Sequence, residues 1–505
     1  MPVSGWMKPC EKPVVSPTPV WANAIPGNSA IAAAATIAAA GCATNPVTGK
    51  SDVVTMSAAQ EVELGRKMHP QILQEYGRYE DEALQAYVSE LGQRIAAKSH
   101  RPDLQYTFTV LDSEEVNAFA LPGYVYITRG IMAYLNSEAE LAAVLGHEVG
   151  HITARHSVRQ QTGATATGVG ATVIGILTGS GDLAGLANMA GTALVRGYGR
   201  DMELEADKLG AEYLNRVGFE PEAMIDVVRL LKNQEMLEVQ MARQENRKPR
   251  IYHGVFASHP DNDTRLHEVV KAAGKVQNSE ERPDNREGYL GHINGMPMGA
   301  SRAQGIVRGS RFYHGDLGFT LAFPTGWVVD NQRTNVIAMS PPKDALMQVS
   351  ATGVPQGMPP KELLGRVLQG VATTRSEPLA VNGLDGYYAV VRSTSLPWGT
   401  QGPAMFAVVY YNNLAYVFQG APRQAAGLSS FEPVFLSSVK TFRRLCDNEF
   451  QQAEPDRIRV VQVPQGATVE QLAKNSPIDK YPVERLRLLN DLYPDKQPTV
   501  GQKVK

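Results

Sequence analysis

One hexapeptide constrains the fold of this chain more than any other stretch. Residues 146–151 read Gly-His-Glu-Val-Gly-His, so His147 and His151 are four residues apart. On an α-helix this spacing places both imidazoles on one face, one turn apart, where their nitrogens can bind one metal ion at about 2.0–2.1 Å. Glu148 follows the first histidine directly and can reach water at that metal. The pattern H-E-x-x-H is typical of zinc-dependent peptide hydrolases in which the glutamate is the general base.

The surrounding residues predict that this motif lies on a buried helix. Ser137 and Glu140 match the S-x-x-E capping box that begins many helices. Apolar side chains recur with helical spacing on both sides of the motif, at Leu141, Val144, Leu145 and Ile152. Two histidines on an unrelated surface helix would lack this apolar stripe. We therefore expect both histidines to lie in the core of a domain.

A later acidic segment can supply the third protein ligand that a catalytic zinc requires beside its open position. Residues 203–207 read Glu-Leu-Glu-Ala-Asp, and Glu203 and Asp207 share one face of a helix. We expect Glu203 to bind the metal and Asp207 to hold a ligand histidine through its second ring nitrogen. If Glu203 is not the ligand, Glu205 is the next candidate.

Length and composition bound the remaining possibilities. A chain of 505 residues predicts three or four domains at about 100–200 residues each. The 49 Lys and Arg residues nearly balance the 51 Asp and Glu residues, and no long run of one sign occurs, so we expect no nucleic-acid partner. Three cysteines argue against a disulfide framework.

The N-terminal residues resemble an export signal. Residues 30–41 form an Ala-rich run that is too short to span a bilayer as a helix, and Cys42 follows it. Small residues before a cysteine resemble a bacterial lipobox, although Ala39 stands where a leucine is usual. We expect residues 1–42 to be a signal peptide with its lipobox, and an acylated Cys42 to anchor the protein on the periplasmic side of the outer membrane. A plain secretory signal and a disordered leader are the alternatives.

The next part of the chain predicts a tether followed by a domain. Residues 43–56 are polar and turn-rich, which indicates a tether, and residues 57–275 contain the metal motif. Within them, Tyr124–Thr128 is either a sheet edge that aligns an extended peptide or part of an ordinary core hairpin. Residues 161–181 carry no charge and are rich in small residues, which favours a mobile substrate lid.

The C-terminal half predicts a linker and two further parts. Residues 276–310 are polar and indicate a linker. Residues 311–445 contain strand-like and helix-like segments, which predicts a separate α+β domain of unknown role with a faint resemblance to the PsbP-like α/β sandwich. Residues 457–505 resemble a LysM-type glycan-binding module, with Gly466-Ala467-Thr468 in place of the usual Gly-Asp-Thr. This tail is either a peptidoglycan contact or a structural cap.

Three segments together resemble one family. His147–His151, the run Arg200–Asp207 and the loop at His259 are similar to the CAAX-prenyl-protease-like (HtpX/BepA-like) zinc metallopeptidases, which are gluzincins. Cys42–Gly49 resembles the lipoprotein members, and the resemblance covers about residues 42–275. The expected fold class is therefore α+β, with a mainly helical gluzincin peptidase domain and a small sheet, then the α+β domain and the LysM-like module.

The resemblance also implies chemistry. Zinc would be held by His147, His151 and Glu203, with Glu148 as general base and Asp207 behind the ligands. The family implies an envelope endopeptidase whose polypeptide substrates are outer-membrane or misfolded proteins. A chaperone-like binder that rarely cleaves is one alternative, although the intact Glu148 argues against it. A peptidoglycan-associated binding protein is the other.

The resemblance further suggests that His259 is an active-site group. Its imidazole could occupy the fourth zinc position and block the resting enzyme. It could instead donate a hydrogen bond to the oxyanion of the reacting carbonyl, or lie on the surface with neither role. Pro260 limits how this loop can move because its φ is fixed. The resemblance favours the blocking role.

Overall fold

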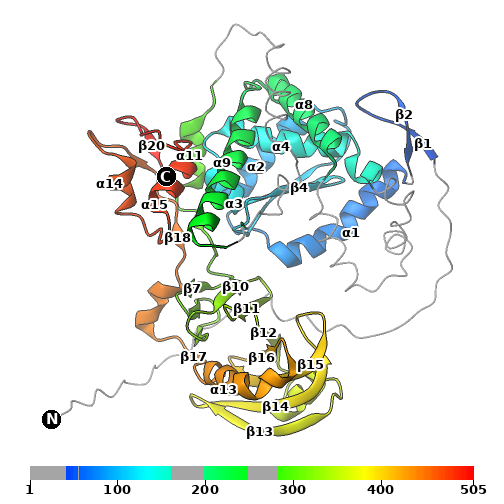
Figure 1. Cartoon of the computed structure of the whole chain (residues 1–505). Helices are drawn as coiled ribbons and strands as arrows, with labels where there is room; N and C mark the ends of the chain where they lie inside the picture. Colours follow the sequence, from blue (N-terminus) through cyan, green and yellow to red (C-terminus); the bar gives the residue numbers. More distant parts are fainter. Residues whose placement is uncertain (1–40, 55, 161–197, 248, 250–282) are drawn as a thin grey trace. The chain divides into compact units, whose positions relative to one another are not determined.

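The chain folds into two compact units in this computed structural model (Figure 1). The residues that the structure describes are 41–54, 56–160, 198–247, 249 and 283–505. The motif unit contains the described residues up to Gly299 together with Asp456–Lys505, and the sheet unit is Ala300–Pro455. Among the helices of these residues, none combines the length and the apolar character that a membrane crossing requires.

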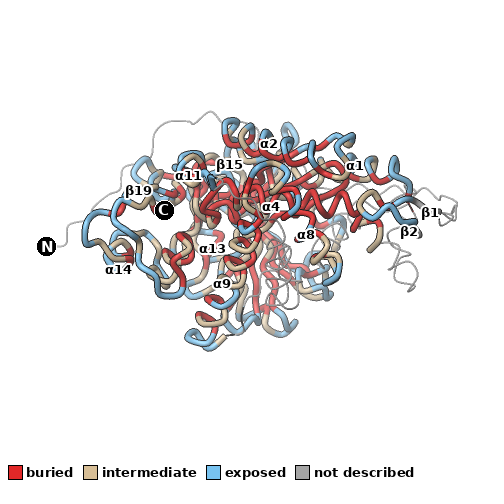
Figure 2. Tube along the Cα trace, turned by 90° about the horizontal axis from the view of Figure 1, so that it is seen from above, coloured by how far each residue is buried: buried red, intermediate tan, exposed pale blue. Residues whose placement is uncertain are grey.

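Helix α4 (Glu138–Thr153) carries the H-E-x-x-H motif through the centre of the motif unit. The Ser137 hydroxyl accepts a hydrogen bond from the Glu140 backbone N–H, which caps the first turn. The Glu140 carboxylate accepts from the Asn136 N–H rather than from Ser137, so only half of the predicted capping box forms. Nearly the whole helix is buried, as the red tube in Figure 2 shows. Four aliphatic side chains of α4 are fully buried, and the burial of each contributes about 1.5–3 kcal/mol to the stability of the fold. They are Leu141, Val144, Leu145 and Val149.

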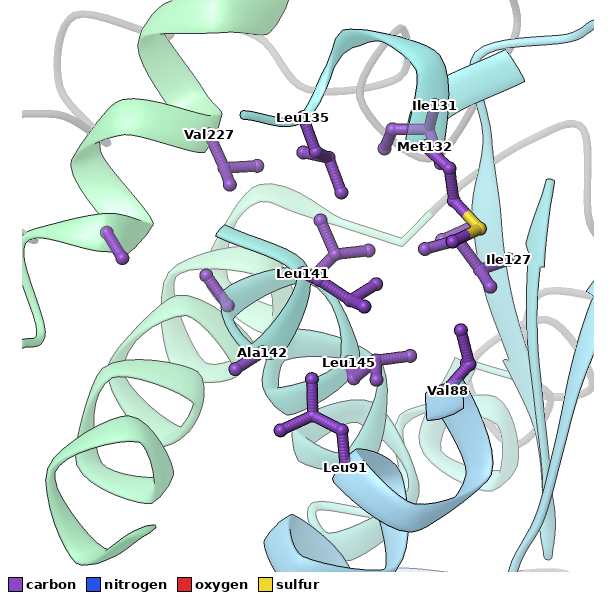
Figure 3. Packing of buried hydrophobic residues seen from close by; sticks show 14 of the residues in the cluster. Val88, Leu91, Ile127, Ile131, Met132, Leu135, Leu141, Ala142, Leu145 and Val227 are labelled. Carbon is purple, nitrogen blue, oxygen red and sulfur yellow. The ribbon is translucent and has the colours of Figure 1, made fainter. Parts of the chain in front are cut away.

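Helices from both sides of the motif in sequence enclose α4. It packs against α2, α8 and α9. Leu91 of α2, Leu145 of α4 and Val227 of α9 belong to one buried cluster and point into one core (Figure 3). The other helices that the structure describes in full before residue 250 are α1 (Ala58–Tyr76), α2 (Glu82–Ala96), α3 (Arg129–Tyr134), α8 (Arg200–Val217) and α9 (Ala223–Gln244).

A three-stranded sheet lies beside the motif helix. Its order is β3-β5-β4, with β3 (Thr107–Leu111) parallel to β5 (Tyr124–Thr128) and β4 (Ala118–Leu121) antiparallel to β5. The segment Tyr124–Thr128 is therefore the central strand, and the prediction that it forms the sheet edge is wrong. The alternative of a core hairpin is confirmed, since β4 and β5 are joined directly and are largely buried. Strand β4 is one of the two edge strands of this sheet, and it packs against α4.

The predicted tether, residues 43–56, contains regular structure. β1 (Gly41–Thr44) and β2 (Ser51–Val54) pair as an antiparallel hairpin. The buried Asn45 side chain accepts hydrogen bonds from the backbone N–H groups of Val47 and Thr48, and this Asx turn closes the hairpin. Polar, turn-rich composition therefore indicated a turn here rather than an extended tether.

Part of the predicted linker, residues 276–310, belongs to the core of the motif unit. Helix α11 (Arg286–Ile293) buries Tyr289, Leu290 and Ile293 completely, and the Tyr289 hydroxyl donates to the Met132 carbonyl at 2.6 Å. Strand β6 (Pro297–Met298) follows it. The linker prediction is wrong for these residues because polar average composition concealed three apolar side chains on one helical face.

The tail belongs to the motif unit and also has a small buried apolar cluster of its own. Strand β18 pairs with β6, and Lys505 donates from its Nζ to the carbonyls of Ala133 and Leu135 at 2.7 and 2.8 Å. The order strand, helix, helix, strand agrees with the sequence expectation, while the LysM assignment stays a prediction. The tail elements are β18 (Asp456–Arg457), β19 (Val461–Gln462), α14 (Val469–Ala473), α15 (Pro482–Leu489) and β20 (Lys503–Val504).

The sheet unit is built on a seven-stranded antiparallel sheet of order β10-β11-β12-β16-β15-β14-β13. Helix α13 packs on one face and α12 on the other, each over its own apolar cluster. A smaller sheet has the order β17-β9-β8-β7. The elements are β7 (Ile306–Arg308), β8 (Arg311–His314), β9 (Phe319–Ala322), β10 (Val328–Asn331), β11 (Asn335–Met339), β12 (Ala345–Gly353), α12 (Pro360–Val367), β13 (Thr373–Val381), β14 (Leu384–Ser395), β15 (Gln401–Tyr411), β16 (Leu414–Pro422), α13 (Leu428–Val439) and β17 (Arg443–Arg444).

Candidate metal centre

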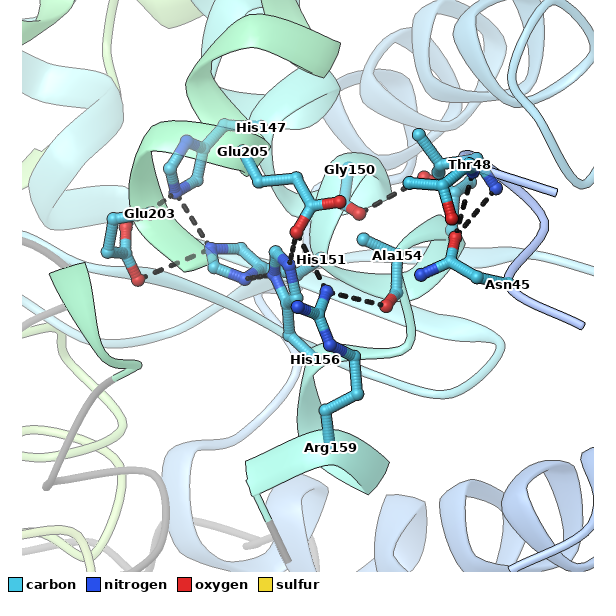
Figure 4. Close-up of polar contacts among 12 residues, drawn as sticks. Asn45, Thr48, His147, Gly150, His151, Ala154, His156, Arg159, Glu203 and Glu205 are labelled. Atoms are coloured by element: carbon cyan, nitrogen blue, oxygen red, sulfur yellow. Dashed lines mark hydrogen bonds and ion pairs between the residues drawn. The ribbon is translucent and has the colours of Figure 1, made fainter. Parts of the chain in front are cut away.

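Three buried side chains converge at the middle of α4. The Nε2 atoms of His147 and His151 are 2.9 Å apart, and the Glu203 carboxylate lies 3.3 Å from the first and 3.5 Å from the second. Ligand atoms at about 2.0–2.1 Å from a tetrahedral zinc are about 3.3 Å from one another. The three groups therefore already have the spacing of three corners of such a site. They are the residues that the sequence suggested as ligands, and together they can hold a metal ion (Figure 4).

Glycines on both helices let α8 approach α4 closely enough for Glu203 to reach the histidines. A Cβ atom on Gly150 would lie 3.1 Å from the Ala206 carbonyl oxygen. One on Gly210 would lie 3.0 Å from the backbone nitrogen of His147. Both distances are shorter than ordinary Cβ contacts. The glycines inside and beside the motif thus have a packing role that the H-E-x-x-H pattern alone does not express.

The electrostatics of the centre suit a divalent cation. Burial lowers the pKa of His147, but hydrogen bonds and charge from Asp207 and Glu203 outweigh it and raise the pKa to about 10. Burial opposes ionisation of Glu203, yet the two histidines hold its pKa well below the usual range. Burial lowers the pKa of His151 to about 3. Two buried carboxylates beside two imidazoles form a site that favours positive charge, and imidazole nitrogen with carboxylate oxygen is a donor set that zinc accepts.

Asp207 lies behind the first histidine. Its Oδ1 is 2.9 Å from His147 Nδ1, and both side chains are fully buried. With a metal bound at His147 Nε2, the proton of the neutral ring would be on Nδ1, where Asp207 accepts it. The pair fixes the tautomer and the orientation of His147.

Glu148 is the remaining acidic group of the motif. It is buried, and its Oε1 has no hydrogen-bond partner among the described residues. Burial is the main cause that raises the pKa of Glu148 to about 8. The charge of His147 acts in the opposite direction, and the charge of Glu203 acts in the same direction as burial. A desolvated carboxyl group with a pKa near neutrality has the properties of a general base.

Two residues near the centre were not singled out from the sequence. The His156 ring nitrogen Nδ1 is 2.8 Å from His151 Nδ1, and Tyr198 stacks on His151 with ring centroids 4.1 Å apart. Glu205, the alternative ligand, does not join the cluster: its carboxylate lies 3.2 Å from His156 and 2.7 Å from Arg159. Hydrogen bonds from His156 and Arg159 lower the pKa of Glu205 to about 2. The sequence feature that could have pointed to His156 is its position as a third histidine, five residues after His151.

Two predicted features fall outside the described residues. His259 lies in the range 250–282, and the predicted lid, residues 161–181, lies in the range 161–197. Their roles stay predictions.

Comparison with known proteins supports the same reading of the site. Residues 82–273 match peptidase family M48. Over 244 residues the chain is 30% identical to the beta-barrel assembly-enhancing protease of Escherichia coli (strain K12), covering 46% of this chain and 48% of that protein. It is 28% identical over 248 residues to the mitochondrial metalloendopeptidase OMA1 of Schizosaccharomyces pombe, covering 47% of this chain and 68% of that protein. The chain thus spans about half the length of the bacterial relatives it matches.

One solved structure matches a part of the chain. Cyanobacterial PsbP from Synechocystis sp. PCC 6803 is 12% identical, covers 28% of this chain and 96% of its own, and has a TM-score of 0.22. The PsbP-like resemblance of residues 311–445 stays a prediction.

The family match includes the H-E-x-x-H helix and Glu203, and the matched segment is the one that forms the buried metal cluster. The match to peptidase family M48 therefore falls on the same part of the chain as the cluster that can hold a metal ion.

Proposed function

We propose that this protein is a zinc-dependent metalloendopeptidase of the bacterial cell envelope. The observation that carries the proposal is the buried cluster of His147, His151 and Glu203, with Glu148 adjacent to it in the same helix. A binding protein without catalysis would have no use for an acidic side chain at that position. Fully desolvated carboxyl groups are costly to bury, and this one is retained beside three metal-binding side chains.

Each residue has a defined task in the proposed reaction. His147, His151 and Glu203 would hold zinc, and the bound metal would supply Lewis-acid chemistry for the peptide carbonyl and for water. Glu148 takes a proton from the attacking water and delivers it to the leaving amine. Asp207 keeps His147 in the tautomer whose Nε2 lone pair faces the metal position.

The sheet offers a way to align the substrate. The edge strand β4 packs against the motif helix, and its outer edge has no partner strand among the described residues. An extended polypeptide that added to this edge by main-chain hydrogen bonds would run past α4 without side-chain specificity. This binding mode suits a protease that accepts unfolded polypeptides.

The test of the proposal replaces Glu148 by glutamine. The change is isosteric, so we expect one zinc per chain and a native fold, but no cleavage of casein or of an unfolded porin. Glu140→Gln is the matched control, because it makes the same change two turns earlier on α4, at a partly buried carboxyl whose pKa desolvation raises to about 7. Cleavage by Glu148→Gln near the wild-type rate would show that another group is the base.

The biological setting of the proposal comes from the relatives. Because the bacterial relatives are named beta-barrel assembly-enhancing proteases, we place this protein in quality control of outer-membrane or misfolded proteins. Acylation of Cys42 would hold it at the periplasmic side of the outer membrane. Mass spectrometry of the mature protein tests this, since an unmodified N-terminus at another residue would contradict it. Peptidoglycan contact by residues 457–505 stays a prediction that a pull-down with the full chain can test.

A further inference from the structure

A chain of three polar side chains extends from His151 away from the metal position. His151 Nδ1 is 2.8 Å from His156 Nδ1, and His156 Nε2 is 3.2 Å from Glu205 Oε2. Arg159 Nη1 donates to the same carboxylate oxygen at 2.7 Å (Figure 4). His156 is fully buried, and the residue before it, Arg155, has a left-handed backbone with a φ of +56°.

The direction of each hydrogen bond in this chain follows from the metal position. His151 Nε2 faces His147 and Glu203, so its lone pair must point there when a metal is bound. The proton of the neutral ring is then on Nδ1, and it is donated to His156 Nδ1. His156 consequently carries its own proton on Nε2 and donates it to Glu205. The guanidinium of Arg159 pairs with that carboxylate, so every donor in the chain has one acceptor.

The two ligand histidines are therefore supported differently. His147 contacts the carboxylate of Asp207 directly, whereas His151 reaches the carboxylate of Glu205 through an intervening imidazole. Tyr198 stacks on His151 and its ring is 5.7 Å from that of His156, so both rings are also held from the side.

We propose that His156 is a positioning residue that orients His151 and strengthens it as a metal ligand, with Glu205 and Arg159 fixing the proton of His156. The proposal deepens the proposed function and rests on it. His156 is not a fourth ligand, because its nitrogen Nδ1 faces the Nδ1 of His151, on the side of that ring away from the cluster. Loss of such a partner behind a metal-binding histidine typically weakens metal binding by about 10–100-fold.

The experiment measures the zinc dissociation constant by chelator competition, with thermal unfolding of the same samples without added metal. His156→Leu fills a similar volume with an apolar side chain but removes the acceptor nitrogen that faces His151. We expect zinc binding to weaken by about 10–100-fold. His156→Asn places an amide oxygen near the position of Nδ1, and we expect it to restore most of the lost affinity. We expect a smaller loss for Glu205→Gln, which still offers an acceptor and whose side chain is partly exposed. Glu212→Gln, on the same helix and paired with Arg216 instead, is the matched control and should bind zinc normally.

The outcomes separate this inference from the proposed function. A wild-type chain that binds no zinc would overturn the proposed function itself. A wild-type chain that binds zinc, together with His156→Leu of equal affinity, would overturn only the positioning role. Equal weakening by the leucine and asparagine variants would also overturn it, since that result indicates packing rather than a hydrogen bond.

Discussion

The close contact between α4 and α8 predicts how the centre responds to one added methyl group. In Gly210→Ala the new Cβ would lie 3.0 Å from the His147 backbone nitrogen and 2.5 Å from Met224 Cε. The methionine end can move, but the backbone cannot, so the helices must separate by about 0.4 Å to reach an ordinary contact of 3.4 Å. Overpacking of this kind costs about 1–3 kcal/mol, while alanine in a helix gains about 1 kcal/mol over glycine.

We therefore expect Gly210→Ala to change the free energy of unfolding by only about 0–2 kcal/mol in the destabilising direction. Zinc affinity should also fall, because a separation of about 0.4 Å takes up most of the tolerance of about 0.5 Å within which ligand positions must be kept. Gly291→Ala on α11 is the control: its Cβ meets nothing within 4 Å, so it should gain stability and keep zinc affinity. Denaturant unfolding and chelator competition measure both quantities. Normal zinc affinity in Gly210→Ala would refute the claim that helix spacing sets the site.

Three further predictions concern single carboxylates and the histidine outside the described residues. Glu203→Ala should abolish high-affinity zinc binding, whereas Glu205→Ala should only weaken it; metal analysis after dialysis distinguishes the two, and the reverse order would remove Glu203 as the ligand. His259→Ala should raise cleavage of an unfolded substrate with zinc still bound if the imidazole blocks the metal; a fall in kcat of up to about 10²-fold would indicate the oxyanion role, and no change would remove His259 from the site. The Arg443 hydrogen bond lowers the pKa of Glu449 from 4.5 to about 2, so its stabilisation is present above pH 4.5 and is lost as the pH falls toward 2. Glu449→Gln should cost about 1–2 kcal/mol at pH 7 after solvent screening and almost nothing near pH 2, measured by urea unfolding with tryptophan fluorescence; an equal cost at both pH values would contradict this.

The elements that could be predicted are those whose signal is local. The apolar spacing and the Ser137 cap predicted α4 before its surroundings were known, and Ser57 with Gln60 forms the complete capping box that begins α1. The metal cluster was within reach for the same reason: one helix supplies two of its three groups, and an acidic helix supplies the third. The signals that predict α4 and the start of α1 do not depend on where distant parts of the chain lie.

The sheet unit contained a local signal that was missed. Asn382 and Gly383 join β13 to β14 and both have positive φ, at 50° and 81°. Asn-Gly is the preferred pair for this type of two-residue hairpin. Strand β13 itself is mostly exposed and includes charged residues, so hydrophobic alternation could not reveal it. The turn, rather than the strand, carried the information.

His156 could not be assigned from its position in the sequence. It follows α4 by three residues, and its direction depends on the left-handed backbone of Arg155, a conformation that non-glycine residues seldom adopt. Buried contacts of Arg155 with Glu61 at 3.2 Å and with the Met56 carbonyl at 3.0 Å stabilise that turn. These partners are about a hundred residues earlier in the chain. Only the folded structure therefore shows that His156, five residues after His151 and beyond the end of α4, faces a metal ligand.

The boundaries of the motif unit follow from the same non-local packing. Leu290 of α11 and Ile458, Leu488 and Tyr493 of the tail belong to the buried cluster that surrounds α4, so residues beyond 82–273 complete the core of the peptidase domain. A fragment that ended at residue 275 would leave these apolar surfaces of the core without their partners. Asp456 pairs with Met298 across the β6 and β18 strands, so the residues that flank 300–455 on either side are neighbours within the motif unit. The sheet unit is thus inserted at a single strand pair, as a long connection between two antiparallel strands of the domain that holds the metal.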